Sequence, residues 1–159
     1  MDTVTLSVVV TGAGRGIGRE IAKQCVAGGM RVVGVDTNFD EDDATVERVR
    51  GDVRDQSIID AAFGTASRDG AVVSLVTAAG VTLPESGSYS VESWETTISV
   101  NLSSVFRWVE QFRNLVAGGA MIGSSVVTIA SLSAHRAFAN NPGYVASKTG
   151  VLGLTRAFA

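Results

Sequence analysis

Residues 6–18 read LSVVVTGAGRGIG, and this stretch decides the fold. Leu6–Thr11 is a short run rich in β-branched residues that stops at a glycine, which predicts a buried strand. The glycines after it permit a tight turn, and the bare amides of such a turn can bind a pyrophosphate where the next helix begins. A glycine pattern alone is also compatible with an ordinary turn, but the order strand, glycines, helix and second strand favours dinucleotide binding.

Further apolar runs along the chain predict four more strands. They cover residues 31–36, 46–53, 72–78 and 125–130. Helical patterns lie between them, and strands that alternate with helices form a parallel sheet covered on both faces. The sequence therefore predicts a doubly wound α/β (Rossmann) fold in which residues 1–159 are a single domain.

The helices are expected between these strands. Apolar residues at helical spacing follow the glycine turn over residues 17–26. Asp55 and Ser90 are predicted to cap two later helices, the second of them long, and a last helix begins near Pro142. Core packing is the interpretation for both tryptophans, Trp94 and Trp108.

Composition excludes several classes of protein. Of the 159 residues, 45% are hydrophobic and 18% are charged, which is incompatible with an intrinsically disordered chain. No apolar run is long enough to span a membrane, and no signal peptide is recognisable. No membrane is therefore an expected partner, and because the net charge is −3 without a basic stripe, a nucleic acid is not expected either. The lone cysteine, Cys25, is consistent with a cytoplasmic protein.

Asp36 ends the second predicted strand, 18 residues after Gly18. A ribose-binding acid is expected about 20 residues beyond the glycine turn. A carboxylate at this place accepts hydrogen bonds from ribose hydroxyls and repels a 2′-phosphate, so NAD is favoured over NADP. Arg15 argues in the other direction, because a guanidinium in the turn can pair with that phosphate.

Tyr144 and Lys148 are four residues apart at the start of the last helix, so they share one face. An ammonium near a phenol favours the deprotonated form, which suits the phenol to proton transfer. Ser131 follows the last predicted strand, at the edge of the sheet where ligands bind, and its hydroxyl can hold a substrate oxygen. Ser133 is the alternative for this role.

These motifs resemble those of the short-chain dehydrogenase/reductase family. The resemblance lies in TGAGRGIG at 11–18, NLSSVF from Asn101, IAS at 129–131 and YVASK at 144–148. It implies NAD(P)-dependent oxidation of a secondary alcohol, or reduction of the corresponding carbonyl compound. It also implies catalytic roles: Tyr144 as proton donor and acceptor, Ser131 on the reacting oxygen, Lys148 on the tyrosine and the nicotinamide ribose, and Asn101 beside a proton-relay water.

The same resemblance assigns the adenine-binding pair to Asp52 and Val53, and a cofactor-contacting strand end to residues 77–80. That strand end reads TAAG where the family usually has two asparagines, so polar support is lost there. The expected cofactor-binding residues are Gly12, Arg15, Gly16, Ile17, Gly18, Asp36, Asp52, Val53, Ala78, Ala79, Gly80, Tyr144 and Lys148. No metal site is expected.

Family members continue with further strands, a Pro-Gly turn facing the nicotinamide and a substrate lid. We therefore expect the fold to lack its C-terminal strands, and the chain to be a fragment, a truncated product, or a protein whose remainder is not represented in these 159 residues. The resemblance also implies a homo-oligomer, a dimer or tetramer, built on the long helix and the Tyr144 helix. The alternative function is a dinucleotide-binding or redox-sensing module without catalysis.

Overall fold

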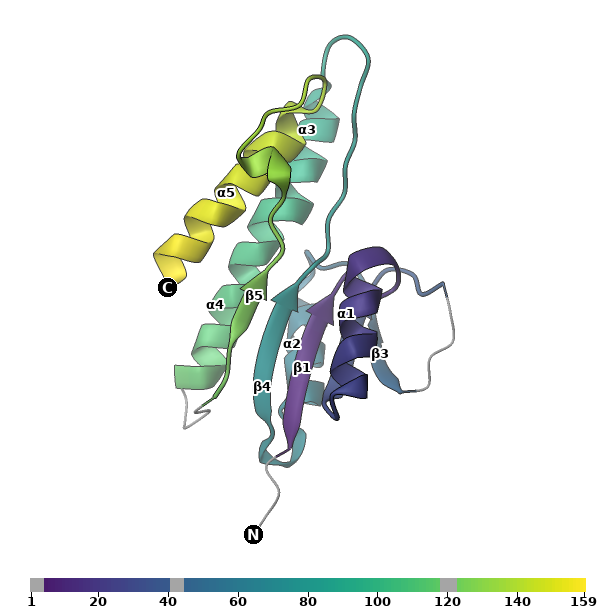
Figure 1. Ribbon diagram of the computed structural model, residues 1–159, viewed down its shortest axis with the longest axis vertical. Helices are drawn as coiled ribbons and strands as arrows, with labels where there is room; N and C mark the ends of the chain where they lie inside the picture. Colours follow the sequence, from purple (N-terminus) through teal and green to yellow (C-terminus); the bar gives the residue numbers. More distant parts are fainter. Residues whose placement is uncertain (1–4, 41–44, 118–122) are drawn as a thin grey trace.

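Five parallel strands form one sheet in the computed structural model, which describes residues 5–40, 45–117 and 123–159 (Figure 1). The strand order is β3-β2-β1-β4-β5, so the chain builds outward from β1 to one edge and then returns to build the other. The strands are β1 (Leu6–Thr11), β2 (Arg31–Asp36), β3 (Val46–Arg50), β4 (Val72–Thr77) and β5 (Val126–Thr128). The predicted Rossmann topology is confirmed.

Helices cover both faces of the sheet, with α1 on one face and α2 and α4 on the other (Figure 1). The helices are α1 (Gly16–Ala27), α2 (Gln56–Ala66), α3 (Val91–Ile98), α4 (Ser104–Ala117) and α5 (Pro142–Phe158). In the described ranges, none of these helices is long and apolar enough to cross a membrane.

The four strands β1 to β4 each contribute to two apolar clusters because successive side chains point to opposite faces. Val9 belongs to the larger cluster, which α2, α4 and α5 complete. Val8 and Val10 belong to the smaller cluster under α1, where they meet Ala22. Continuous burial of Val8–Val10 explains why β1 is apolar without alternation.

Three strands are shorter than predicted, β4 by one residue only. β3 ends at Arg50, because Gly51 makes the last bond to β2 and Asp52 then begins a turn in which its carbonyl accepts from Asp55 N. β5 covers three residues, although Ser125 O and Ile129 N still bond to β4 on either side of it. In this sheet β5 is an edge strand.

The expected caps differ in their chemistry. Ser90 Oγ accepts from Ser93 N at 3.1 Å, so this cap is confirmed. Asp55 occupies the cap position of α2, but in the described part of the chain its side chain makes no capping bond and its backbone carbonyl accepts instead. Extended backbone at Asp55 is sufficient to start the helix.

The core interpretation is correct for Trp108 and wrong for Trp94. Trp108 is 1% exposed, and its Nε1 donates to Val53 O at 2.9 Å. Trp94 is 41% exposed. It lies in the first turn of α3, beyond the strand ends, where it lines an open surface hollow with Tyr89 and Phe138.

The long helix expected after Ser90 is interrupted. α3 and α4 are joined by one π-helical turn, Ser99–Ser103, which contains the buried Asn101. An extra residue in a helical turn rotates the side chains that follow, and such turns are frequent at functional sites.

In the turn after β1, backbone segments pack directly against one another. Gly12 has a φ of 71°, and a Cβ added there would lie 2.7 Å from Ala79 N and Cα. A Cβ added to Gly18 would collide with the carbonyl oxygen of Gly12. Only glycine lets α1 start this close to β1 and β4.

We expect Gly18→Ala to lower the free energy of unfolding by about 1–3 kcal/mol, because backbone must move to admit the methyl group. Chemical denaturation measures this change. Gly64→Ala is the matched control: Gly64 is exposed in α2, and apart from its own helical turn no described atom lies within 4 Å of an added Cβ. It should stabilise by about 0.5–1 kcal/mol. Equal stability of Gly18→Ala and the natural chain would contradict the close packing of α1.

Candidate active site

A groove with a volume of about 440 Å³ lies at the carboxyl ends of the parallel strands. Open α/β sheets bind ligands at this edge. It is lined by every cofactor-binding residue expected outside α5, namely Gly12, Arg15, Gly16, Ile17, Gly18, Asp36, Asp52, Val53, Ala78, Ala79 and Gly80. The fold therefore gathers four separate segments of the sequence along one surface.

The start of α1 can bind an anion. Gly16, Ile17 and Gly18 form its first turn and line the groove. Among the described residues no side chain caps this helix, and its first turn has no acidic residue. The amides and the helix dipole therefore offer partial positive charge, to which the exposed Arg15 adds a full charge.

The half-buried Asp36 carboxylate lies at the end of β2 and lines the groove. It accepts hydrogen bonds from Gly14 N at 2.9 Å and from Asn38 N at 3.2 Å. Thr37 Oγ1 lies 3.4 Å from it. These contacts hold the negative charge in place beside the glycine turn.

The strand end at residues 77–80 has support that the sequence did not reveal. Thr11 Oγ1 accepts from Ala78 N at 3.1 Å and from Ala79 N at 3.2 Å. The hydroxyl at the end of β1 thus orders the segment in which the family usually has asparagines. Thr77 Oγ1 is itself buried with no hydrogen-bond partner in the described structure.

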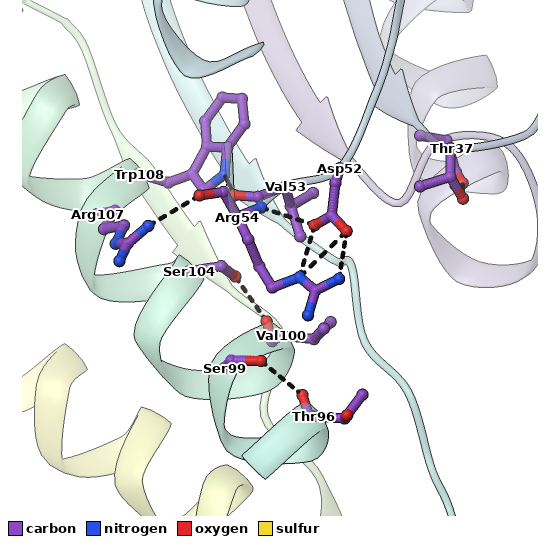
Figure 2. A network of polar contacts seen from close by, with 11 residues as sticks. Thr37, Asp52, Val53, Arg54, Thr96, Ser99, Val100, Ser104, Arg107 and Trp108 are labelled. Atoms are coloured by element: carbon purple, nitrogen blue, oxygen red, sulfur yellow. Dashed lines mark hydrogen bonds and ion pairs between the residues drawn. The ribbon is translucent and has the colours of Figure 1, made fainter. Parts of the chain in front are cut away.

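Asp52 forms an ion pair with Arg54 at the wall of the groove, as Figure 2 shows. Arg54 Nη2 donates to Asp52 Oδ2 at 2.6 Å, and Arg54 Nε lies 3.0 Å from Oδ1. Hydrogen bonding to the guanidinium lowers the pKa of Asp52 below its usual range. Sequence reasoning missed Arg54; the repeated charges of the GDVRD segment are the only signal that could have found it.

Asn101 ties α5 to the groove. Its Oδ1 accepts from Val81 N and its Nδ2 donates to Val81 O, both at 2.8 Å. Nδ2 also lies 3.2 Å from the buried Ser147 Oγ, which donates to Tyr144 O. The π-helical turn therefore connects the Tyr144 segment with the segment after β4. Ser147 is a second residue that sequence reasoning missed, although it lies within the YVASK motif.

Lys148 and Tyr144 lie together on α5. The Lys148 ammonium is 5.8 Å from the centre of the Tyr144 ring, and its Nζ donates to Ile129 O at 2.8 Å. A Cβ on Gly80 would be 3.7 Å from Lys148 Nζ and 3.3 Å from Asn101 Oδ1. Lys148 and Asn101 therefore stand beside the groove at Gly80, and burial lowers the pKa of the Lys148 amine.

Ser131 lies at the start of a short 3₁₀ turn, Leu132–Ala134. Its Oγ accepts from Ser133 N at 3.1 Å and lies 3.2 Å from Ser133 Oγ. Ser131 is half-buried and Ser133 is buried, so the hydroxyl of Ser131 is the more accessible of the two. Within the described residues no cluster of three His, Cys, Asp or Glu side chains is placed to bind a metal.

A comparison with known protein families matches residues 6–159 to the short chain dehydrogenase family. The chain is 33% identical over 165 residues to D-threitol dehydrogenase of Mycolicibacterium smegmatis. That alignment covers 95% of this chain and 62% of the relative, so the chain spans less than two thirds of the relative's length.

Solved structures agree with this match. Aldohexose dehydrogenase of Thermoplasma acidophilum superposes with a TM-score of 0.87 at 27% identity, covering 98% of this chain and 61% of the other. Actinorhodin polyketide ketoreductase with NADPH superposes with a TM-score of 0.80 at 29% identity, covering 96% of this chain and 63% of the other. 4-Hydroxyisoleucine dehydrogenase with NADH and succinate superposes with a TM-score of 0.80 at 25% identity, covering 96% of this chain and 71% of the other.

Because the amine of Lys148 is buried, we expect the stability of the fold to depend on pH. Its pKa is lowered on folding, so at alkaline pH the folded chain binds fewer protons than the unfolded chain. Stability should therefore gain from Lys148 as the pH rises from the lowered pKa towards the ordinary lysine value of about 10.4.

Denaturation at several pH values, with Lys148→Met as the reference, measures this gain. The free energy of unfolding of the natural chain should rise relative to the variant across that interval. Lys23→Met, on α1, controls for the loss of one lysine. A difference that is constant with pH would contradict the burial of the charged amine.

Proposed function

The chain belongs to the short-chain dehydrogenase/reductase family, and from this we propose that it binds NAD(H) in the groove and oxidises a secondary alcohol or reduces the corresponding ketone. One observation carries the proposal: the groove lined by the glycine turn is also lined by Gly80, beside which Lys148 and Asn101 stand. When bound, the nicotinamide supplies hydride chemistry, and the protein supplies position and a proton.

Binding begins at the glycine turn. The amides of Gly16, Ile17 and Gly18, with Arg15, hold the diphosphate. Asp36 accepts hydrogen bonds from the adenosine ribose, and the segment around Asp52 and Val53 receives the adenine. Ala78, Ala79 and Gly80 have small or no side chains, so the nicotinamide half of the dinucleotide can approach the backbone closely.

Proton transfer belongs to the residues beyond Gly80. Tyr144 donates its proton to the carbonyl oxygen in reduction and accepts one in oxidation. Ser131 donates a hydrogen bond to the same oxygen, and the Lys148 ammonium stabilises negative charge on the phenol and binds the nicotinamide ribose. The side chain of Asn101 is committed to Val81 and Ser147, so its support of a relay water falls to its backbone carbonyl.

NAD is the proposed coenzyme. Asp36 is held by Gly14 N in a partly buried position, where a 2′-phosphate on the ribose would meet a fixed negative charge. Arg15 is the opposing residue. Related structures contain NADPH or NADH, so family membership alone does not choose between them.

From the same family membership we propose the domain organisation, the compartment, the oligomer and the substrate class. Residues 1–159 act as one NAD(P)-binding domain in the cytoplasm, and copies associate through α4 and α5. The substrate is a small alcohol or carbonyl compound, as in the relatives named for threitol and aldohexose.

Tyr144→Phe should abolish turnover while NADH binding stays within about twofold, because only the proton is lost from the site. NADH fluorescence measures binding, and absorbance with a panel of alcohols and ketones measures turnover. Tyr89→Phe removes a phenolic hydroxyl near Thr97, outside the groove, and should retain turnover.

The outcomes separate the proposal from its alternative. Undiminished turnover in Tyr144→Phe contradicts the proton path. NADH binding by the natural chain without turnover on any substrate favours a dinucleotide-binding module instead.

Asp36→Asn should raise the affinity for NADPH relative to NADH by about tenfold or more, since the repulsion disappears while an acceptor for Gly14 N remains. Arg15→Gln should change this ratio in the opposite direction, because it removes the cation available to the phosphate. Calorimetric titration of both coenzymes measures the ratio. An unchanged ratio in both variants would remove these residues from coenzyme selection.

A further inference from the structure

Arg54 lines the groove on the side away from the proposed catalytic residues Tyr144 and Lys148. Thr37, Thr96 and Val100 lie around Asp52 and Arg54 and also line the groove (Figure 2). A dinucleotide with its diphosphate at the glycine turn and its ribose at Asp36 must place its adenine in this part. Figure 2 shows the Arg54 guanidinium here, between the Asp52 carboxylate and Val100.

The orientation of Arg54 is held by Asp52. Nε lies 3.0 Å from Oδ1 and 3.1 Å from Oδ2, and Nη2 lies 2.6 Å from Oδ2. Arg54 N also donates to Oδ1 at 2.9 Å. Donation along one edge by two nitrogens fixes the plane of a guanidinium, while its faces stay available for stacking.

The backbone beneath this ion pair is anchored to α4. Trp108 Nε1 donates to Val53 O at 2.9 Å, and Arg107 Nη1 donates to Arg54 O at 2.8 Å (Figure 2). Trp108 is fully buried, so the segment is attached to the core. Arg54 therefore does not rely on an exposed ion pair alone for its position.

We propose that Arg54 is an adenine-binding residue whose guanidinium stacks on the base, and that Asp52 acts chiefly by holding Arg54. The inference rests on the proposed binding of a dinucleotide. Guanidinium groups stack on aromatic faces, and a nucleobase presents such a face. Both oxygens of Asp52 already accept from Arg54, so a hydrogen bond from the adenine amino group is the smaller part of its role.

Two ligands separate stacking from recognition of the amino group: adenosine diphosphate and inosine diphosphate. Hypoxanthine stacks as adenine does but has no amino group. Arg54→Leu and Arg54→Lys should each weaken both ligands by about tenfold, because neither side chain offers a plane. Asp52→Asn should also weaken both ligands to a similar degree.

The controls are a third ligand and a remote variant. Nicotinamide mononucleotide lacks the adenosine half, so its affinity should be the same in every variant. Arg68→Leu removes one exposed positive charge outside the groove and should bind both diphosphates as the natural chain does.

Several results would overturn the proposal. Natural affinity in Arg54→Lys would show that charge is sufficient and stacking is absent. Loss of adenosine diphosphate but not inosine diphosphate in Asp52→Asn would assign Asp52 to the amino group. Equal affinities in Arg54→Leu and the natural chain would remove Arg54 from the site, whereas failure of the natural chain to bind any of the ligands would overturn the proposed function as well.

Discussion

The close approach of two backbone segments at the carboxyl ends of β1 and β4 is the constraint on which the site depends. Gly12 leaves room for Ala79, and the Thr11 hydroxyl accepts from the amides of Ala78 and Ala79. A side chain at Gly12 would separate these segments, and the groove floor would no longer be continuous from the glycine turn to Gly80. The absence of side-chain atoms is what allows a long, flat ligand to lie against main chain.

The Tyr144 segment is connected to this floor by polar contacts inside the protein. Asn101 reaches Val81 after β4 and Ser147 on α5, and the π-helical turn carries it to that position. Lys148 is bonded to Ile129 after β5. Because buried polar groups are costly to leave unpaired, these bonds keep α5 in register with the ends of β4 and β5.

Two parts of the groove are thus organised by different means. Beside Gly80, Ser147 Oγ donates to Tyr144 O and Lys148 Nζ donates to Ile129 O, and burial lowers the pKa of the Lys148 amine. On the opposite side of the glycine turn, Asp52 and Arg54 form a partly exposed pair whose backbone is attached to Trp108. An exposed ion pair contributes little stability by itself, so the anchoring to the core decides whether Arg54 has a fixed place.

Periodicity and glycine placement were sufficient to predict the strands, the helices and their parallel order, because buried strands and amphipathic helices are local patterns. They also located the glycine turn and Asp36 in the groove lining, since a parallel sheet brings its loops to one edge, whereas Asp52, Val53 and residues 78–80 were expected from the family resemblance. The π-helical turn, the exposure of Trp94 and the early end of β3 were not predictable, because each depends on which neighbour is in contact and not on the residue's own pattern. The hydrogen bonds that join Thr11 to Ala78, Asn101 to Ser147, and Arg54 to Asp52 were not predictable for the same reason. Hydrogen-bond partners outside the strand and helix patterns are selected by distances of a few ångströms, and for most of these residues only the packed fold sets those distances.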